Sequence, residues 1–360
     1  MKYEYWFAGI RNIPDRTKIK LKEKAGTAEA IYYIEETALR KMQLLKEQEI
    51  WKLLEAKKKE ELDRNYEAMR QKGISVIPWG EKEYPSRLKE IYDPPYALYV
   101  KGKLPDNTAR AAAIVGARSC TPYGEKYALE YGKKLAECGI QVISGLARGV
   151  DGSGQRGALL GGGKTFAVLG SGVDVCYPKN HMGLYLDILE QEGGILSELP
   201  PGTPPLPQHF PRRNRIISAL SDIVLVMEAR ERSGSLITAD LALEQGKDVY
   251  ALPGPVNSSL SQGCNRLIFQ GAGILLSPEN LLDEMGIAYS GECEKSDKKK
   301  KMLESPEYMV YSCVGLYPKS VGQLTEETKL RPEEVLKLLV SLELQGYIRE
   351  ISKNYYIKVK

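Results

Sequence analysis

Short apolar runs alternate with longer amphipathic stretches through the middle of the chain. The apolar runs span three to five residues and are typical of buried strands: 111–115, 141–144, 165–169, 194–196, 223–227 and 248–251. Between them lie stretches of helical length with apolar positions on one face: 123–138, 152–160, 180–191 and 235–245. Strands that alternate with helices in this way are typical of βαβ units. The pattern therefore predicts an α/β core built on a parallel sheet from about residue 108.

The chain before this core has a different pattern. Residues 1–72 carry charged runs with helical periodicity, such as 38–71, and few helix breakers. The segment 9–26 resembles a helix-hairpin-helix, which offers backbone N–H groups to a phosphate, and an ordinary small helical bundle is the alternative. Two proline-bounded runs that resemble strands come next: 73–79 and 92–100. We predict a helical domain, SAM-like or helix-hairpin-helix-like, over 1–72 and a core over 73–288.

The chain after the core predicts a linker and a third domain. Residues 289–302 are charged and include four lysines, Lys298–Lys301, typical of a solvated linker, although a basic run can also contact nucleic acid. Residues 303–360 then predict three helices and two strands: 306–313, 320–329, 332–345, 347–351 and 355–359. Pro332 suits the first turn of its helix. Three helices followed by a hairpin are typical of a winged helix.

Composition excludes several classes of protein. With 42% hydrophobic and 27% charged residues, the chain can bury a core, so overall disorder is excluded. No apolar run reaches about 18 residues, and the start lacks a basic cap followed by an apolar stretch. We therefore expect no membrane span, no secretory signal and a cytoplasmic location. The net charge of +4 is too small to indicate nucleic-acid binding by itself.

Cysteine and histidine offer no metal site in the sequence. The six cysteines never form a C-x-x-C pair, and the two histidines, His181 and His209, are isolated from each other. Reduced thiols are the expected state, and we predict neither a metal nor a cofactor.

Four loops rich in Gly, Ser and Arg follow predicted strands: 114–124, 143–151, 170–180 and 229–238. Small residues let a phosphate approach backbone N–H groups, and the N-terminus of the following helix favours an anion. One such loop is weak support, because tight turns need glycine for steric reasons. Four loops at one edge of a parallel sheet form a stronger argument.

The most specific segment is 209–221. It places three arginines and Asn214 beside Phe210, which combines phosphate-binding charge with a ring on which a base can stack. This combination binds single-stranded nucleic acid without reading its sequence. The alternative is a helix start whose arginines form salt bridges. Asp151 has two interpretations as well, a general base or a cap for the helix at Gly152.

Two glycine-rich segments imitate nucleotide-binding motifs. Residues 161–165 resemble the end of a P-loop, but Ala158 stands where the first glycine is required, and the strand follows the motif. Gly170-x-Gly172 continues to Val175, so the dinucleotide motif is incomplete. Neither segment supports an ATPase or a dehydrogenase, and no Ser/His/Asp or Cys/His set is present.

Six segments together resemble the bacterial DNA processing protein A family, DprA or Smf: 116–118, 144–151, 177–178, 210–217, 233–238 and 252–255. The resemblance runs in order from about Ile74 to Gly286. It implies an extended Rossmann-like core that binds single-stranded DNA, forms a homodimer and helps load RecA onto DNA during natural transformation. The flanking helical and winged-helix regions are similar to accessory domains of the family.

The chain departs from the family at one position. The family's usual Ala-His-Arg-Gly is Gly154-Gln155-Arg156-Gly157 here. Glutamine does not titrate near neutral pH, so the substitution favours binding over catalysis. A weakened DNA contact is the alternative.

We therefore predict a non-enzymatic mediator that binds single-stranded DNA, protects incoming DNA and has RecA as a partner. The alternative is a nucleoside-monophosphate hydrolase on a related fold, but its Pro-Gly-Gly-x-Gly-Thr loop and catalytic Glu are absent, with Asp240 in the place of the Glu. The predicted DNA-binding residues are Gly116, Arg118, Ser144, Gly145, Arg148, Gly149, Lys179, Phe210, Arg212, Arg213, Asn214, Arg215, Ser233, Gly234, Ser235 and Thr238.

The winged helix is predicted to bind protein or to regulate. Its recognition helix begins with Glu333 and Glu334, which oppose a polyanion. The wing carries Lys353, Lys358 and Lys360, so a weak non-specific DNA contact is the alternative.

Overall fold

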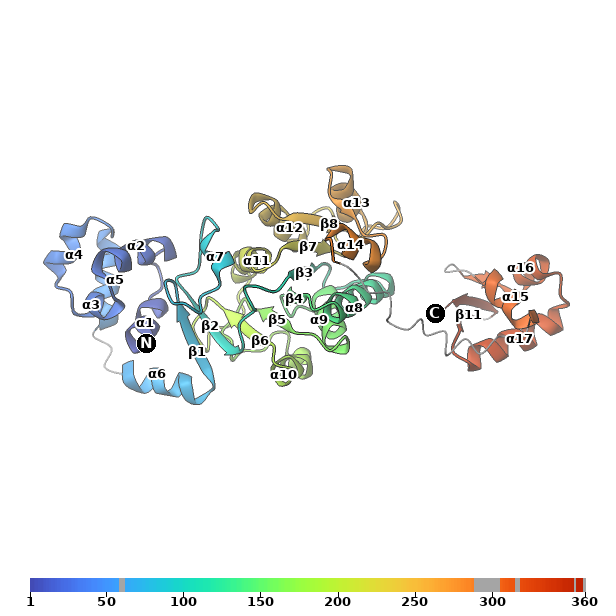
Figure 1. Cartoon of the computed structure of the whole chain (residues 1–360), viewed down its shortest axis with the longest axis horizontal. Helices are drawn as coiled ribbons and strands as arrows, with labels where there is room; N and C mark the ends of the chain where they lie inside the picture. The colour runs from blue at the N-terminus through green and yellow to red at the C-terminus, as the bar shows by residue number, and fades with distance from the viewer. Residues whose placement is uncertain (58–61, 288–304, 315–317, 353, 359–360) are drawn as a thin grey trace. The chain divides into compact units, whose positions relative to one another are not determined.

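The computed structural model describes residues 1–57, 62–287, 305–314, 318–352 and 354–358 (Figure 1). The chain divides into two compact units, Met1–Tyr289 and Ser290–Lys360. Most of the predicted linker, including Lys298–Lys301, lies outside the described residues.

A single sheet forms the centre of the first unit. Among the described residues its order is β1-β2-β6-β5-β4-β3-β7-β8-β9. The strands are β1 (Ile74–Pro78), β2 (Ala97–Gly102), β3 (Ala111–Val115), β4 (Gln141–Ser144), β5 (Thr165–Val168), β6 (Gly194–Ser197), β7 (Ile223–Val226), β8 (Asp248–Ala251) and β9 (Gly273–Ile274). All six strands expected in the core are present, and their ends agree to within one residue. Each of these core strands is parallel to its core neighbours, which confirms the Rossmann-like α/β fold.

The sheet is not purely parallel. Strand β1 pairs antiparallel with β2, and β2 pairs antiparallel with β6. The parallel arrangement predicted from about residue 108 therefore holds for the core strands, and the two strands that precede it add an antiparallel edge. Strands β1 and β2 are joined by a loop with the short helix α7 (Ser86–Lys89), and a direct antiparallel pair needs no crossover helix.

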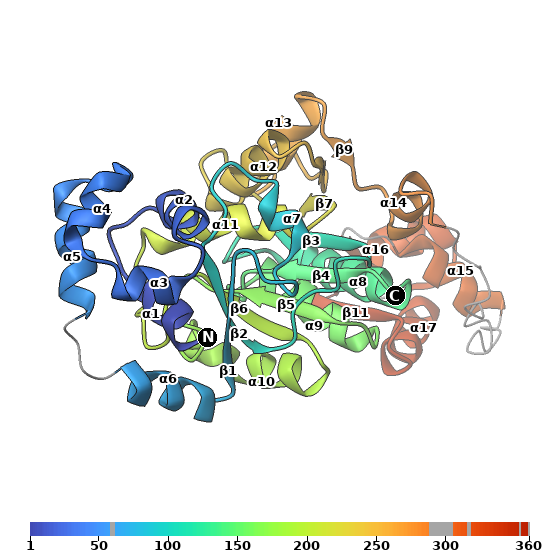
Figure 2. The same ribbon diagram turned by 60° about the vertical axis from the view of Figure 1, so that its left-hand side comes forward.

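Helices cover both faces of this sheet (Figure 2). One face carries α11 (His209–Ala219), α12 (Gly234–Glu244) and α13 (Gln262–Phe269). The other face carries α8 (Pro122–Glu137), α9 (Val150–Leu160), α10 (Met182–Glu190) and α14 (Pro278–Glu284). The predicted helix over 180–191 begins with a 3₁₀ turn, Lys179–His181.

The backbones of α8 and α9 approach each other closely. A Cβ on Gly132 would lie 2.1 Å from the carbonyl oxygen of Gly154, and one on Gly157 would lie 2.1 Å from that of Leu129. The crossing therefore needs glycine on both helices, and this contact fixes α9, whose N-terminus faces the carboxyl ends of the strands.

Six short helices precede the sheet: α1 (Lys2–Gly9), α2 (Asp15–Ala25), α3 (Ala28–Tyr33), α4 (Glu36–Met42), α5 (Glu47–Lys57) and α6 (Leu62–Gln71). The periodic stretch 38–71 is thus not one helix, and α4 ends where Gln43 takes a left-handed conformation with a φ of 50°. The Phe7 and Tyr96 rings are 5.0 Å apart, so these helices share a core with the β1–β2 edge. A domain boundary at residue 72 stays a prediction.

The second unit has the predicted winged-helix architecture. Its elements are α15 (Ser305–Cys313), β10 (Lys319–Ser320), α16 (Val321–Thr328), α17 (Pro332–Leu344), β11 (Ile348–Ser352) and β12 (Tyr355–Lys358). Pro332 occupies the first turn of α17, as predicted. A small core centred on Leu324, Val335 and Leu339 holds the helices together. Lys353 and Lys360 of the wing lie outside the described residues.

Candidate nucleic-acid interface

The four Gly-rich loops meet at one edge of the sheet. They follow β3, β4, β5 and β7, which are adjacent in the order β5-β4-β3-β7. They surround a groove of about 580 Å³ whose lining includes nine of the predicted residues: Gly116, Arg118, Phe210, Arg213, Asn214, Ser233, Gly234, Ser235 and Thr238. A smaller pocket of about 150 Å³ beside it adds Gly145 and Arg148. This is the edge at which ligands bind in open α/β sheets.

Two aromatic rings form one wall of the groove. Phe210 is half-buried at the start of α11, and its ring centroid lies 5.7 Å from that of Tyr177. The Arg118 guanidinium lies over the Phe210 ring at 4.9 Å. Tyr177 is 42% exposed, which leaves an aromatic surface accessible from the groove. Tyr177 belongs to one of the six family-like segments but is not among the predicted DNA-binding residues.

Exposed cations surround these rings. Arg118 and Arg148 project from the loops after β3 and β4 and line the groove or the pocket beside it, and Lys179 lies at the end of the loop after β5, outside both linings. None of the three has an ion-pair partner within the described part of the chain. Arg230, in the loop after β7, is also exposed and lines the groove. Arg230 is not among the predicted DNA-binding residues, although its position in the fourth Gly-rich loop indicates this site.

Two helices point their N-termini at this edge. Helix α9 begins after Gly149, whose φ is 71° and whose added Cβ would lie 2.4 Å from the carbonyl oxygen of Ala117. Helix α12 begins at Gly234, after Ser233, whose hydroxyl hydrogen-bonds the Ser235 hydroxyl at 2.8 Å. In the first turn of α9 the Val150 and Gly152 N–H groups already donate to the Ala117 and Ala147 carbonyls, at 3.2 and 3.1 Å, so α9 contributes mainly the partial positive charge of its N-terminus. At α12 the N–H groups of Gly234 and Ser235 are those that a helix leaves without an intrahelical partner.

Arg213 is a buried cation beneath the groove. Its guanidinium donates a hydrogen bond to the Val168 carbonyl at 2.7 Å and packs against Gly145, where a Cβ would lie 1.8 Å from Nη1. Burial lowers the pKa of Arg213 to about 10, and the nearby carboxylate of Asp151 opposes that change. Its Nε has no hydrogen-bond partner among the described residues. A buried cation of this kind favours an anion in the groove.

Asp151 does not cap the helix at Gly152, so that interpretation is wrong. Helix α9 already begins at Val150, and the Asp151 carboxylate instead accepts a hydrogen bond from the Gly145 N–H at 3.1 Å. Burial raises the pKa of Asp151, and Arg213 works against this rise. The residue thereby ties the loop after β4 to the first turn of α9.

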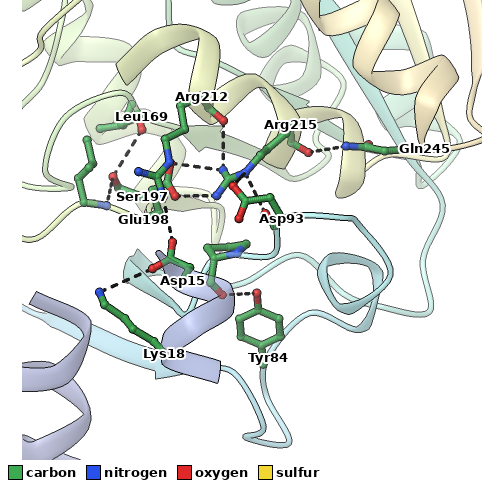
Figure 3. A network of polar contacts seen from close by, with 12 residues as sticks. Asp15, Lys18, Tyr84, Asp93, Leu169, Ser197, Glu198, Arg212, Arg215 and Gln245 are labelled. Carbon is green, nitrogen blue, oxygen red and sulfur yellow. Dashed lines mark hydrogen bonds and ion pairs between the residues drawn. The ribbon is translucent and has the colours of Figure 1, made fainter. Parts of the chain in front are cut away.

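Arg212 and Arg215 lie on the other side of α11 (Figure 3). The Arg215 Nη2 is 2.7 Å from Glu198 Oε2, and its Nε is 3.3 Å from Asp93 Oδ2. The Arg212 Nε lies 3.3 Å from Glu198 Oε1, and its Nη2 lies 3.1 Å from Asp15 Oδ2. The salt-bridge alternative is therefore correct for these two arginines. Arg215 is buried in ion pairs, and the prediction that it contributes to the exposed charge is wrong.

The geometry of the helix explains this division. Successive residues turn by about 100°. Phe210, Arg213 and Asn214 therefore share the groove face, whereas Arg212 and Arg215 share the opposite face. The adjacent arginines of the sequence segment thus belong to two different environments.

Ser144 and Gln155 support the loops from inside. The Ser144 hydroxyl donates to the Ile114 carbonyl at 2.6 Å. The Gln155 amide oxygen accepts from the Leu146 N–H at 3.2 Å, where Leu146 has a φ of 55°. Both side chains are fully buried. Gln155 therefore does not face the groove, which contradicts the alternative that it marks a weakened DNA contact.

Other kinds of site are not evident in the described ranges. Within them, no three His, Cys, Asp or Glu side chains are arranged to hold a metal ion. None of the described helices has the length and apolar character that crossing a membrane requires. No disulfide joins the described cysteines: Cys120, Cys138, Cys176, Cys264 and Cys313.

Similar proteins have closely related sequences and folds. Protein Smf of Escherichia coli is 39% identical over 287 residues, which is 78% of this chain and 76% of that protein. DNA processing protein DprA of Bacillus subtilis is 41% identical over 225 residues, or 62% of this chain and 75% of that protein.

Two solved structures match as well. The structure of DNA processing protein A from Streptococcus pneumoniae has a TM-score of 0.68 at 32% identity and covers 80% of this chain and 99% of its own. DNA processing protein A from Helicobacter pylori, described for its single-stranded DNA binding mode, has a TM-score of 0.53 at 31% identity. This match covers 59% of this chain and 95% of the Helicobacter pylori chain.

Two family descriptions account for most of the chain. Residues 75–286 match DNA recombination-mediator protein A, and residues 294–352 match the DprA winged helix domain. The first match covers the whole groove edge of the sheet. The chain therefore belongs to the DNA recombination-mediator protein A family, whose members are named DprA or Smf.

Proposed function

We propose that this protein is a recombination mediator that binds single-stranded DNA in the groove at the carboxyl edge of its sheet. The observation that carries the proposal is the coincidence of unpaired exposed cations with an accessible pair of rings, Phe210 and Tyr177. The similarity to the Helicobacter pylori protein and its single-stranded DNA binding mode supports it.

The groove offers separate groups to phosphates and to bases. Arg118, Arg148 and Lys179 supply charge, the N-terminus of α12 supplies backbone N–H groups, and that of α9 adds a partial positive charge. The Phe210 and Tyr177 rings supply stacking surface. In a duplex the base faces are covered by their neighbours, so accessible rings favour a single strand.

The hydrolase alternative gains no support from the groove. Asp240 is exposed and lines a neighbouring depression between α12 and α13 rather than the main groove. The Asp151 carboxylate is already engaged by the backbone. We therefore propose binding without catalysis, and incubation with nucleoside monophosphates tests this, since release of free base would overturn it.

Homodimer formation is part of the proposal. Strand β9 lies at an edge of the sheet, and three large apolar side chains in it or close to it in sequence are exposed: Phe269, Ile274 and Leu276. Phe269 alone is 91% exposed. An unpaired strand edge with such a patch favours association. Light scattering of the protein and of Phe269→Glu tests it, with a dimer expected for the first and a monomer for the second.

The cellular role follows the family resemblance. We propose that the protein protects incoming DNA, helps load RecA during natural transformation and acts in the cytoplasm. A strand-exchange assay with RecA and a single-strand-binding protein tests the loading step, because a mediator shortens the lag before filament formation.

A mobility-shift titration over a salt series tests the DNA-binding step. We expect single-stranded oligonucleotides to bind more tightly than duplexes of the same length. Neutralisation of about four phosphates gives a slope of log K against log salt of about −3 on single strands. Equal affinity for both forms, or a slope near zero, would contradict the proposal.

A further inference from the structure

A second arginine lies over an exposed aromatic ring outside the groove. The Arg16 guanidinium, on α2, lies 4.2 Å from the ring centroid of Tyr92, in the loop after α7. Within the groove, Arg118 lies over Phe210 in the same way at 4.9 Å. Among the described residues, an arginine therefore lies over a ring at two places, one in the groove and one beside the N-terminal helices.

Tyr92 does not serve the core. It is 83% exposed, and its ring contacts no other ring in the described residues. Burial of an aromatic side chain of this size stabilises a protein by roughly a few kcal/mol. Tyr92 does not make this contribution, and its exposure points to a function in binding. Because Arg16 covers one side of the ring, the other side is open to solvent.

The two arginine–ring pairs are connected by a short series of residues. Phe210 is two residues from Arg212, whose side chain is 50% exposed and whose Nη2 lies 3.1 Å from Asp15 Oδ2 (Figure 3). Asp15 is followed by Arg16. On the Tyr92 side, the neighbouring Asp93 pairs with Arg215 of the same helix. The N-terminal end of α11 therefore separates the pairs, with Arg212 exposed between them.

We infer that Tyr92 and Arg16 form a second stacking platform for a single DNA strand that leaves the groove around the N-terminal end of α11. This inference rests on the proposed function. A base stacks on the open face of Tyr92 while Arg16 and Arg212 approach its phosphates. The exposed carboxylates of Glu90 and Asp93 lie close by, so stacking rather than charge carries the contact.

The test compares oligonucleotides that fill only the groove with longer ones. Fluorescence anisotropy of the full chain with oligo-dT of six and of twenty nucleotides measures both affinities. We expect Tyr92→Ala to bind the longer strand at least about fivefold more weakly and the shorter strand as the wild type does, with an unchanged salt slope. Tyr92→Phe should keep the wild-type affinity. Tyr33→Ala is the matched control, because Tyr33 is also exposed but no guanidinium covers it.

The outcomes separate this inference from the proposed function. One outcome would overturn the inference alone: Tyr92→Ala binds both lengths as the wild type does, while Phe210→Ala binds both more weakly. In that case Tyr92 is not a second stacking platform, and the proposed binding in the groove still holds. The pair would then be free for a protein partner. If Tyr92→Ala weakens the binding of both lengths equally, Tyr92 affects binding within the groove itself, and this result also overturns the inference. If the wild-type protein binds neither length, the proposed function fails as well.

Discussion

The two sides of helix α11 use arginine in opposite ways. On the groove side, Arg118 and Arg148 surround the Phe210 ring without carboxylate partners among the described residues. On the other side, Arg212 and Arg215 share Glu198, whose side chain is 5% exposed. A cluster of arginines in a sequence therefore indicates DNA binding only where the fold leaves their charge unneutralised.

The energetics of the two sides differ accordingly. A buried ion pair often adds little net stability, since both charges lose water, but removing one partner leaves an isolated buried charge. Burial raises the pKa of Glu198, and the two arginines counteract that rise. The exposed groove cations have no such partner to lose. Substitutions should therefore affect stability on one side and DNA affinity on the other.

The largest effect should come from the buried pair. Arg215→Ala leaves Glu198 buried without its closest partner, and we expect unfolding free energy to fall by about 3–5 kcal/mol. Urea denaturation measures the change, and Arg212→Ala is the control because it keeps the 2.7 Å pair between Arg215 and Glu198. A stable Arg215→Ala variant with weakened DNA binding would contradict this division by assigning Arg215 to the DNA-binding groove.

Removal of the groove ring should have the next largest effect. Phe210→Ala should cost about 1–3 kcal/mol of single-strand affinity, because a base loses its stacking surface, and should leave the salt slope unchanged. Phe210→Tyr should retain most of the affinity. Thermal melting is the accompanying measurement: a large fall in Tm with normal affinity would show that Phe210 fills the core instead.

Removal of one groove charge should have a smaller and different effect. Arg118→Ala should flatten the dependence of log K on log salt by roughly 0.7, the contribution of one phosphate contact on a single strand. Arg110→Ala is the matched control, because Arg110 is exposed at the opposite end of β3. Arg212→Ala is an intermediate case. The Arg212 side chain is half exposed and allows a phosphate contact, but its carboxylate partners oppose that contact. Equal slopes for Arg118→Ala and Arg110→Ala would contradict the role of the groove cations.

Loss of the winged helix should have the smallest effect. A chain ending at Lys301 retains the entire first compact unit and every groove residue. On α17, Leu336, Val340 and Leu344 present exposed apolar side chains at four-residue spacing, which suits protein contact better than phosphate contact. We expect single-strand affinity close to that of the full chain. A loss of tenfold or more in a folded truncation would make the winged helix a primary DNA-binding element.

The sequence alone located the strands and helices of the core and brought the four Gly-rich loops to one edge. Those features depend on local apolar periodicity, on turn residues and on the fixed handedness of βαβ units. Asn214 and Ser233 could be assigned to the groove for the same reason. Pro332 at the start of α17 is likewise a local property of the chain.

Which arginines keep an unneutralised charge depends on contacts between distant parts of the chain. Asp15 reaches Arg212 across 197 residues of sequence, and Asp93 reaches Arg215 across 122. The antiparallel β1–β2 edge and the contact of Asp151 with the Gly145 N–H were also decided by the tertiary structure. Local sequence specifies the charge of a side chain and its face on a helix, but its neutralisation depends on which distant carboxylate the fold brings within a few ångströms, because ion pairing falls off steeply with distance and solvent exposure.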